Sequence, residues 1–408
     1  MTKKEKCVLA YSGGLDTSCC IKWLMENKNV DVICVVGDVG QEKEDLNYVC
    51  EKALKVGAIA AEAVDMQEEF VNEYITSALA ANCMYENKYP MVSALSRPVI
   101  AKHLVDLCHK YGAKYVAHGC TGKGNDQVRF EVAVQSLDPT LTILAPVREW
   151  DLLTRPQEME WAQAHGVPVP TTKSSPYSID DNLWGRAIEC GVLEDPWNEP
   201  PADIFALTAD PESAPDEPEY VELTFEAGVP CAINGESKSF HDIILQMNEI
   251  AGKHGYGRVD MVENRLVGVK SREVYEVPGA LAIVKAHQEL EEICLERDLL
   301  HEKPILEQKW ANLVYNGFWF SPLKQAIDAF CASTQKCVTG TVRMKFYKGN
   351  CTFVGKKSPY SLYDEGLATY DSGDTFDRES SAGFIALHGL SVRNWAHHRA
   401  IVGKTGVI

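Results

Sequence analysis

Residues 7–18 of the chain read CVLAYSGGLDTS, a short apolar run that ends in two glycines and continues into helix-forming residues. Glycine tolerates positive φ and lets a ligand approach the backbone closely, so successive N–H groups of such a turn can form a nest for an anion. A helix that starts directly after the turn adds about half a positive charge at its N-terminus. Ser12, Thr17 and Ser18 add hydroxyl donors. The stretch therefore predicts a phosphate-binding turn between a strand and a helix.

Two better-known phosphate motifs do not describe this turn. The Walker pattern GxxxxGK[ST] does not occur, because the nearest candidate, Gly122-Lys123, has Ala117 where the first glycine is required. The dinucleotide pattern GxGxxG does not fit the turn either. An ordinary glycine-rich turn with Asp16 as a helix cap is the alternative for a bare SGG. The position after the first strand and the full string SGGLDTS favour the phosphate site.

Strands and helices alternate outward from this turn to residue 147. Apolar, β-branched runs predict strands at residues 31–36, 115–117 and 141–145, and apolar residues at helical spacing predict helices at 17–25, 46–54, 99–111 and 128–137. This order implies right-handed βαβ units, hence an α/β fold with a mostly parallel sheet. Ligands bind beyond the carboxyl ends of the strands in such a sheet, which is where the glycine turn is expected.

The second part of the chain has a different pattern. Three prolines in residues 167–176 break the alternation, so we expect a nucleotide-binding domain at 1–168, an α+β domain at 169–385 and a C-terminal oligomerisation helix at 386–408. Strands are predicted at 220–225, 259–262 and 342–346, and helices at 240–247 and 280–297. Residues 199–222 hold five prolines and eight carboxylates without Lys or Arg, and we expect a solvated surface excursion there.

The last helix carries an apolar stripe. Val392, Trp395 and Ile401 fall on one face of a helix at about residues 390–401. This stripe packs either on the chain's own core or on another subunit, and the sequence favours neither.

Composition excludes several classes of protein. The 408 residues include 40 Lys and Arg and 58 Asp and Glu, and a net charge of −18 argues against coating nucleic acid or an anionic membrane. The fourteen cysteines form no CxxC pair and show no zinc-site spacing, so we expect free thiols in a reducing cytosol. No run approaches the roughly 18 apolar residues of a membrane span, and the apolar start is too short for a signal-peptide core. These features predict a soluble, cytoplasmic enzyme or binding protein.

A second polar string, AHGCTGKGNDQVRFE, occupies residues 117–131. Its Thr121, Asn125, Asp126 and Arg129 supply a hydroxyl, an amide, a carboxylate and a guanidinium within nine residues, with glycines between them. That set can grip an amino acid, with Asp126 for the ammonium and Arg129 as a fork for a carboxylate. The alternative is a capped surface loop, in which Asp126 begins a helix and Arg129 pairs with a nearby acid.

The two strings together resemble a known family. SGGLDTS resembles the PP-loop of the N-type ATP pyrophosphatases, and residues 117–131 closely resemble the HGxTGKGNDQxRFE segment of the argininosuccinate synthase family. Other matching segments are Tyr89 with residues 96–98, Ser178 with 182–186, and residues 251–255, 262–265, 270–272 with 275–276, and 358–363. The resemblance runs from about Cys7 to the C-terminal helix. It implies a PP-loop domain followed by a synthetase and multimerisation domain.

The resemblance also implies a reaction. ATP, L-citrulline and L-aspartate would give argininosuccinate, AMP and pyrophosphate through a citrullyl-AMP intermediate, in arginine biosynthesis or the urea cycle. No enzyme nucleophile is needed, so catalysis would consist of positioning and charge stabilisation. Mg²⁺ would neutralise the departing pyrophosphate, with Lys123 as a helper and with no metal ligands from protein side chains. Because the chain is acidic, we expect Lys123, Arg97 and the loop amides to concentrate positive charge around ATP. Members of the family are usually homotetramers.

Site residues follow from the resemblance position by position. The expected ATP contacts are Ala10, Tyr11, Ser12, Gly13, Gly14, Leu15, Asp16, Thr17, Ser18, Gly37 in the loop after the second strand, and Gly119. The expected aspartate contacts are Thr121, Asn125 and Asp126. The expected citrulline contacts are Tyr89, Asn125, Arg129, Ser178, Glu263 and Tyr275. Without the family, Glu263 and Tyr275 would be interpreted as a strand ion pair and a core aromatic.

Two positions depart from the family pattern. Ala94 and Ala187 stand where many relatives have a serine that contacts citrulline. Each loss removes a hydrogen bond of about 0.5–1.5 kcal/mol, unless the register shifts so that the adjacent Ser93 substitutes for Ala94.

Two other classes of protein keep the phosphate turn. Another ATP pyrophosphatase would add catalytic cysteines or a glutaminase domain, whereas Cys19 and Cys20 are expected to pack inside the first helix. A nucleotide-binding sensor without catalysis has no need for the amino-acid-binding string at 121–129. The string at 121–129 therefore favours an enzyme that acts on an amino acid over a nucleotide-binding sensor.

Overall fold

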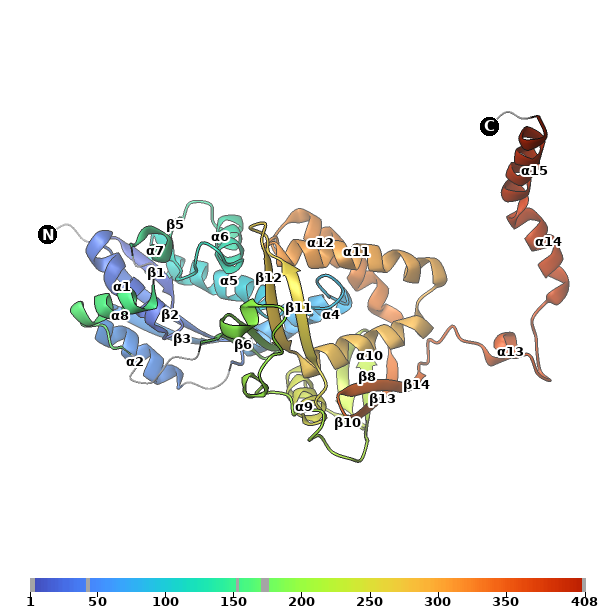
Figure 1. The fold of residues 1–408 in the computed structure, drawn as a ribbon, viewed down its shortest axis with the longest axis horizontal. Helices are drawn as coiled ribbons and strands as arrows, with labels where there is room; N and C mark the ends of the chain where they lie inside the picture. Colours follow the sequence, from blue (N-terminus) through green and yellow to red (C-terminus); the bar gives the residue numbers. More distant parts are fainter. Residues whose placement is uncertain (1–3, 42–44, 152–153, 170–175, 406–408) are drawn as a thin grey trace. The chain divides into compact units, whose positions relative to one another are not determined.

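A computed structural model describes residues 4–41, 45–151, 154–169 and 176–405 (Figure 1). Its first part is built on a parallel sheet with the strand order β3-β2-β1-β4-β5. The strands are β1 (Lys6–Ala10), β2 (Asp31–Asp38), β3 (Ala60–Asp65), β4 (Tyr115–Ala117) and β5 (Thr142–Leu144). The predicted α/β class with a parallel sheet is confirmed.

Alternate residues of β1 point to opposite faces of this sheet, and a helical layer covers each face. Cys7 and Leu9 belong to one core cluster with α1 (Leu15–Asn27), α2 (Leu46–Val56) and α8 (Arg155–Ala164). Val8 belongs to another, which is lined by the long helix α5 (Ser93–Tyr111). The other elements of this part are α3 (Gln67–Glu69), the π-helix η1 (Phe70–Ile75), α4 (Thr76–Ala80), α6 (Asp126–Leu137) and α7 (Pro146–Glu149). Period-two burial along β1 thus explains the three-layer arrangement.

Strand β3 was not predicted from the sequence. Its residues AAEAVD contain one β-branched side chain, and none of the six is fully buried because the strand forms the edge of the sheet. A strand of this kind lacks the apolar run by which β1 and β2 are recognised.

The second part of the chain contains two antiparallel sheets. One has the order β11-β12-β7-β6 and the other β10-β9-β8-β13-β14. Their strands are β6 (Ser178–Asn182), β7 (Gly185–Glu189), β8 (Glu219–Glu226), β9 (Val229–Ile233), β10 (Glu236–Ser237), β11 (Arg258–Asn264), β12 (Lys270–Glu276), β13 (Gly340–Tyr347) and β14 (Asn350–Lys357). The helices are α9 (Phe240–Lys253), α10 (Pro278–Cys294), α11 (Arg297–Tyr315) and α12 (Pro322–Thr334), with 3₁₀ turns η2 (Gly191–Glu194), η3 (Ala202–Ile204) and η4 (Gln335–Cys337).

In this part of the chain, the spacing of apolar residues correctly predicted the buried face of helix α9. Phe240, Ile243, Ile244 and Met247, predicted on one face, are all buried. Helices α11 and α12 were not predicted. Helix α11 contains Pro304 in its interior, and a proline within a helical pattern usually indicates the end of a helix. The core cluster around α5 continues without interruption to α9, α10 and β13, so both parts share one apolar interior.

The acidic stretch 199–222 was predicted to be a solvated surface loop, but part of it is buried. Ile204, Thr208 and Ala214 are buried, and the stretch wraps over a buried carboxylate. Glu276 accepts hydrogen bonds from the backbone N–H groups of residues 206–208 at 2.8–2.9 Å and pairs with Arg186 at 3.0 Å. The expectation of a solvated loop was therefore wrong for this part of the stretch, because a single buried carboxylate with backbone donors anchors it.

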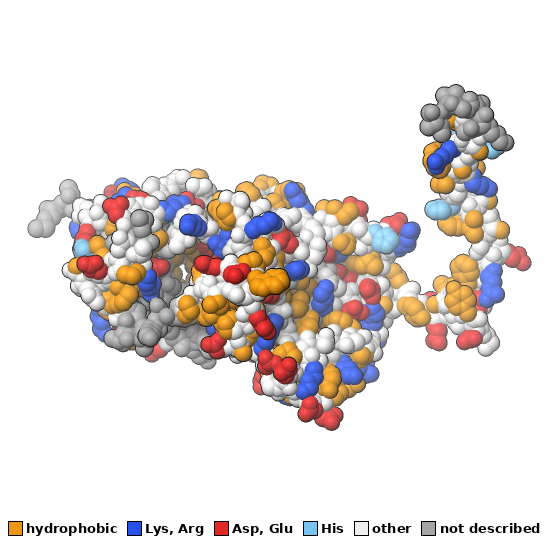
Figure 2. Space-filling model, in the orientation of Figure 1, with side chains coloured by type: hydrophobic (Ala, Val, Ile, Leu, Met, Phe, Trp, Pro, Cys, Tyr) orange, Lys and Arg blue, Asp and Glu red, His pale blue; other side chains and the backbone are white. Residues whose placement is uncertain are grey.

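Contacts divide the chain into a unit ending at Tyr360 and a smaller one beginning at Ser361. The smaller unit contains α13 (Glu365–Ala368), α14 (Arg378–His388) and α15 (Leu390–Thr405). Val392 and Trp395 of the predicted apolar stripe are exposed in it, and Figure 2 shows hydrophobic side chains among charged ones on this unit. The domain boundaries at residues 168 and 385 stay predictions, and six of the ten residues of the predicted breakpoint, 170–175, lie outside the described residues.

Candidate functional site

The glycine turn between β1 and α1 has the shape that the sequence predicts. Gly13 has φ +78°, and Gly14 precedes the first residue of α1 without any side chain capping that helix. The first N–H groups of a helix have no partner within it, so an uncapped start leaves donors for an anion. Asp16 does not cap α1, as the alternative interpretation required, but pairs with Arg155 at 2.9 Å.

Hydroxyl groups and a lysine hold this turn in place. Ser18 Oγ donates to the Gly14 carbonyl at 2.7 Å, and Tyr11 Oη lies 2.9 Å from Ser18 Oγ. Lys52 of α2 donates to the carbonyl oxygen of Gly13. These contacts direct carbonyl oxygens of the turn into the protein, which suits a turn whose outer side receives negative charge.

The loop after β4 lies directly against this turn. A Cβ atom placed on Gly119 would come within 2.9 Å of Thr17 Cγ2 on α1. β1 lies between β2 and β4 in the sheet, so the chain winds in opposite directions on its two sides. A crevice forms outside the carboxyl ends of the strands at such a point. Gly37, predicted in the loop after the second strand, instead lies within β2, and that placement was wrong by a residue or two.

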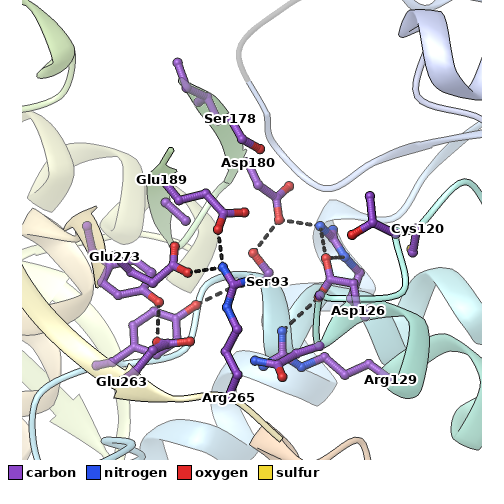
Figure 3. Close-up of a pocket in the computed structure, with 18 of the residues that line it drawn as sticks. Ser93, Cys120, Asp126, Arg129, Ser178, Asp180, Glu189, Glu263, Arg265 and Glu273 are labelled. Carbon is purple, nitrogen blue, oxygen red and sulfur yellow. Dashed lines mark hydrogen bonds and ion pairs between the residues drawn. The ribbon is translucent and has the colours of Figure 1, made fainter. Parts of the chain in front are cut away.

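A cavity of about 400 Å³ opens beside these two loops (Figure 3). Its lining comes from the phosphate turn, α5, the loop before α6, α6 itself and strands β6, β7, β11 and β12. The lining residues are Ser12, Tyr89, Ser93, Arg97, Gly119, Cys120, Thr121, Gly124, Asn125, Asp126, Arg129, Ser178, Ile179, Asp180, Ala187, Glu189, Glu263, Arg265, Glu273 and Tyr275. The fold thus brings segments from residue 12 to residue 275 to one cavity.

Every residue that was predicted to contact aspartate or citrulline lines the cavity, except Ala94, one of the two positions that depart from the family pattern. Of the ATP residues, Ser12 and Gly119 line it, and the others lie in β1, the turn, α1 and β2. At the two departures from the family pattern, Ser93 and Ala187 line the cavity whereas Ala94 is buried in the core. The roles assigned to these residues stay predictions.

Four charged lining residues were not predicted as site residues: Asp180, Glu189, Arg265 and Glu273. A signal was present for all four, because alternate residues along a strand face the same side. Asp180 lies two residues after Ser178 in β6, and Glu273 lies two residues before Tyr275 in β12. Arg265 follows Glu263 by two residues, just after β11 ends. Glu189 at the end of β7 follows Ala187 in the same way.

Asp126 is held by two arginines. Its Oδ2 accepts from Arg97 Nε and its Oδ1 from Arg129 Nη1, both at 2.8 Å. Burial alone would raise the pKa of Asp126, but the two guanidinium groups outweigh it and bring that pKa down to about 2. Two parts of the alternative interpretation hold, because Asp126 is the first residue of α6 and Arg129 pairs with an acid, but no side chain caps this helix and both residues line the cavity rather than a surface loop. A carboxylate has about four lone-pair sites, so Asp126 can still accept from an ammonium.

Arg97 does not provide the free positive charge that we expected near ATP. It pairs with Asp126 and also with Asp180, which accepts a hydrogen bond from Ser93 as well. Burial would lower the pKa of Arg97, but the two carboxylates raise it. The guanidinium therefore stays charged and neutralises acids of the cavity.

Glu263 lies between two pairs of stacked tyrosines. Its Oε2 accepts from Tyr275, whose ring stacks on Tyr89 at 3.9 Å. Its Oε1 accepts from Tyr315, whose ring stacks on Tyr85 at 3.6 Å. Burial raises the pKa of Glu263, and the tyrosine hydrogen bonds oppose that rise. The interpretation as a strand ion pair was wrong, since one oxygen of Glu263 accepts from Tyr275 in the cavity wall and the other from Tyr315 behind it.

Two further carboxylates, Glu189 and Glu273, lie near Glu263 and share one arginine. Arg265 pairs with Glu189 and with Glu273, the latter at 2.6 Å (Figure 3). Burial and the neighbouring Glu189 and Glu263 raise the pKa of Glu273 to about 8. Burial and the two neighbouring carboxylates thus favour the protonated form of Glu273, whereas Arg265 favours the ionised form.

Comparisons with known proteins agree with this geometry. The family model described as arginosuccinate synthase N-terminal HUP domain matches residues 6–168, and the arginosuccinate synthase C-terminal domain model matches residues 177–395. Proteins named argininosuccinate synthase are 57% identical in Streptococcus gordonii, 58% in Geobacillus thermodenitrificans and 57% in Bacillus pumilus. These alignments cover 95%, 95% and 96% of this chain and 96%, 95% and 97% of the relatives.

The chain belongs to the argininosuccinate synthase family. As a member of this family it is an ATP-dependent ligase, and its parallel-sheet part is a nucleotide-binding domain of the HUP type. The resemblance that the two sequence strings indicated is confirmed.

The described residues add two negative findings. Among them, no three His, Cys, Asp or Glu side chains gather in a way that could hold a metal ion. Within the same ranges, every helix is too short or too polar to cross a membrane.

Gly119→Ala tests the contact between the two loops. The added methyl group would lie 2.9 Å from Thr17 Cγ2, closer than two carbons tolerate, so the loop after β4 or the Thr17 side chain must move. Whether the loop or the Thr17 side chain yields, the phosphate turn is disturbed, so we expect the Kd for ATP, measured by calorimetry, to rise about ten-fold, a loss of about 1.4 kcal/mol in binding free energy.

Gly122→Ala is the matched control in the same loop, because its methyl group would have only ordinary contacts, at 3.8 Å from Arg148. It should change the Kd for ATP much less. Unchanged ATP affinity in Gly119→Ala would contradict a nucleotide site between these loops.

Proposed function

We propose that this chain condenses L-citrulline with L-aspartate at the expense of ATP, giving argininosuccinate, AMP and pyrophosphate. One observation supports this most directly. Ser12 of the phosphate turn and Gly119 of the adjoining loop line the same cavity as Tyr89, Asp126 and Arg129 of the amino-acid-binding set. A nucleotide on the turn would therefore have its phosphates beside an amino acid in the cavity.

ATP occupies the turn and the loops beside it in this proposal. The β- and γ-phosphates lie against the uncapped start of α1 and the backbone of residues 10–18, with Gly37 of β2 and Gly119 of the loop after β4 beside them. Uncapped helical N–H groups and the local helix dipole favour an anion at this point. Mg²⁺ arrives with ATP as part of the substrate. It would neutralise the charge that develops on the departing pyrophosphate.

The two amino acids share the charged cavity. Citrulline contacts Tyr89, Arg129, Ser178, Glu263 and Tyr275, with Asn125, Ser93 and Ala187 beside them. Aspartate contacts Thr121, Asn125 and Asp126. Five carboxylates and three arginines line the cavity, and this mixture suits substrates that each carry an ammonium and a carboxylate.

The reaction has two steps and no enzyme nucleophile. The ureido oxygen of citrulline attacks the α-phosphorus, an O–P bond forms, and the bond to the bridging oxygen breaks to release pyrophosphate. The aspartate amine then attacks the ureido carbon, the C–O bond breaks with release of AMP, and the amine loses a proton. Alignment of bound reactants contributes up to about 7–11 kcal/mol to such steps.

A thiolation reaction on the same phosphate turn finds no support. Cys19 and Cys20 are fully buried in α1, as predicted, and burial raises the pKa of Cys19 to about 12. Cys120 lines the cavity, but burial raises its pKa to about 12 as well. A thiol with such a pKa has almost no thiolate at neutral pH and is a poor nucleophile.

A three-substrate assay tests the proposal. Purified protein with ATP, aspartate and Mg²⁺ should release pyrophosphate only when citrulline is added, because citrulline supplies the attacking oxygen. Separate detection of pyrophosphate and orthophosphate identifies the bond that breaks. Orthophosphate release, or pyrophosphate release independent of citrulline, would contradict the proposal.

We also propose a cytoplasmic homotetramer. All fourteen cysteines are free thiols in the described residues, which suits a reducing compartment. In the smaller unit, Phe384, Ile385 and Leu387 of α14 and Trp395 of α15 are each more than 60% exposed. Exposed apolar side chains in this number on two short helices favour contact with other subunits.

Light scattering tests the oligomer. We expect a molar mass about four times that of the 45.2 kDa chain. A monomer at micromolar concentration would contradict it.

A further inference from the structure

Helix α11 ends at Tyr315, directly behind the wall of the cavity. Tyr315 does not itself line the cavity, yet it contacts three residues that do: Glu263, Asn125 and Arg129. Its side chain is 1% exposed. We propose that Tyr315 is a positioning residue that sets the orientation of Glu263 and Arg129 for the amino-acid substrates, an inference that rests on the proposed function.

The hydroxyl group of Tyr315 joins two lining residues. Asn125 Nδ2 donates to Tyr315 Oη at 2.8 Å, and Tyr315 Oη donates to Glu263 Oε1. One donated and one accepted hydrogen bond satisfy the phenol, and they fix its proton on the side of Glu263. The chain of bonds therefore runs from Asn125 through Tyr315 to the carboxylate.

The other oxygen of Glu263 is held in the same way. Tyr275 Oη donates to Oε2 at 2.7 Å. A carboxylate that accepts from a phenol on each oxygen has a fixed plane, and both bonds favour its ionised form. Glu263 thus presents a defined charged edge to the cavity only while both phenols are present.

The backbone and ring of Tyr315 hold Arg129. The carbonyl oxygen of Tyr315 accepts from Arg129 Nε at 3.1 Å, and the guanidinium carbon lies 4.9 Å from the centre of the tyrosine ring. Two residues further on, Gly317 has φ +83°, and a Cβ atom there would lie 3.1 Å from the Cα of Arg129. The turn after α11 therefore packs directly on the first turns of α6.

A tyrosine with only a structural role would need its ring but not its hydroxyl group. The ring already has a stacking partner in Tyr85 at 3.6 Å and 3° between planes. Among the described residues, both hydrogen bonds of the hydroxyl group instead go to lining residues, one of them a carboxylate with a pKa that burial raises. The charged and titratable groups that face Glu263 are Arg129 of α6, Arg265 after β11, Glu273 and Tyr275 of β12, Tyr315 of α11, and Tyr85 and Tyr89 before α5.

Tyr315→Phe removes the oxygen and keeps the ring. Glu263 then loses a hydrogen bond that stabilises its ionised form, so its pKa rises and it takes up a proton at higher pH. We expect the acid limb of the pH profile of kcat/KM for citrulline to move to higher pH. The KM for citrulline should rise at least ten-fold, as for loss of a hydrogen bond to a charged group, and the Kd for ATP should stay within two-fold.

Tyr111→Phe is the matched control. Tyr111 also donates its phenol to a carboxylate, that of Glu62, but both residues lie outside the cavity lining. This variant should leave the KM for citrulline and the acid limb unchanged. A second comparison uses Glu263→Gln, in which Tyr315→Phe should add no further shift of the acid limb, because the titrating group is gone.

The outcomes separate this inference from the proposed function. If the wild-type protein releases pyrophosphate with citrulline, an unchanged acid limb and citrulline KM in Tyr315→Phe overturn the inference. Equal losses of ATP and citrulline affinity with a lower Tm would also overturn it, since they indicate a structural role. If the wild-type protein shows no such activity, the proposed function fails. A ¹³C NMR titration of Glu263, assigned by loss of its signal in Glu263→Gln, then still shows whether Tyr315→Phe raises the carboxyl pKa.

Discussion

The site depends on the parallel pairing of β1 with β4. This pairing joins Cys7, Val8 and Leu9 to residues 115–117, so the loops that leave the two strands must start side by side. Gly119 permits the close approach, because any side chain there would meet Thr17. A phosphate turn and an amino-acid-binding loop that are about a hundred residues apart in sequence thereby share one crevice. One sheet of the second part, with the order β11-β12-β7-β6, then closes the crevice.

Charge in the crevice is distributed differently from what the overall acidity suggested. We expected Lys123, Arg97 and the loop amides to concentrate positive charge around ATP, but Arg97 is paired with carboxylates of the cavity wall, as are Arg129 and Arg265. Acidic and basic side chains are also interspersed on the described part of the surface that Figure 2 shows. A cavity in which arginines and carboxylates are paired attracts a polyanion only weakly. Its arginines and carboxylates can, however, pair instead with the carboxylate and ammonium groups of a bound amino acid. The nucleotide would instead depend on the uncapped helix start and on the Mg²⁺ that it brings.

The sequence predicted those features that local chemistry determines. The glycine turn, strands β1 and β2, the helix face of α9 and the lining set around residues 121–129 all follow from patterns within about fifteen residues. Features set by tertiary contact were missed. The edge strand β3 has no apolar run, and the acidic stretch is anchored by Glu276, which lies more than fifty residues away. Tyr315 was missed because its helix contains Pro304 and because its partners come from α6 and β11. Alternation along β6 and β12 carried enough information to find Asp180 and Glu273.

In the proposed reaction, the crevice aligns the ureido oxygen of citrulline with the α-phosphorus of ATP on the turn after β1. Turnover of citrulline labelled with ¹⁸O at the ureido oxygen, followed by mass spectrometry of the products, tests this alignment most directly. We expect the label in the phosphate group of AMP, since that oxygen leaves carbon while bound to the α-phosphorus. Label in pyrophosphate or in water, with none in AMP, would contradict it.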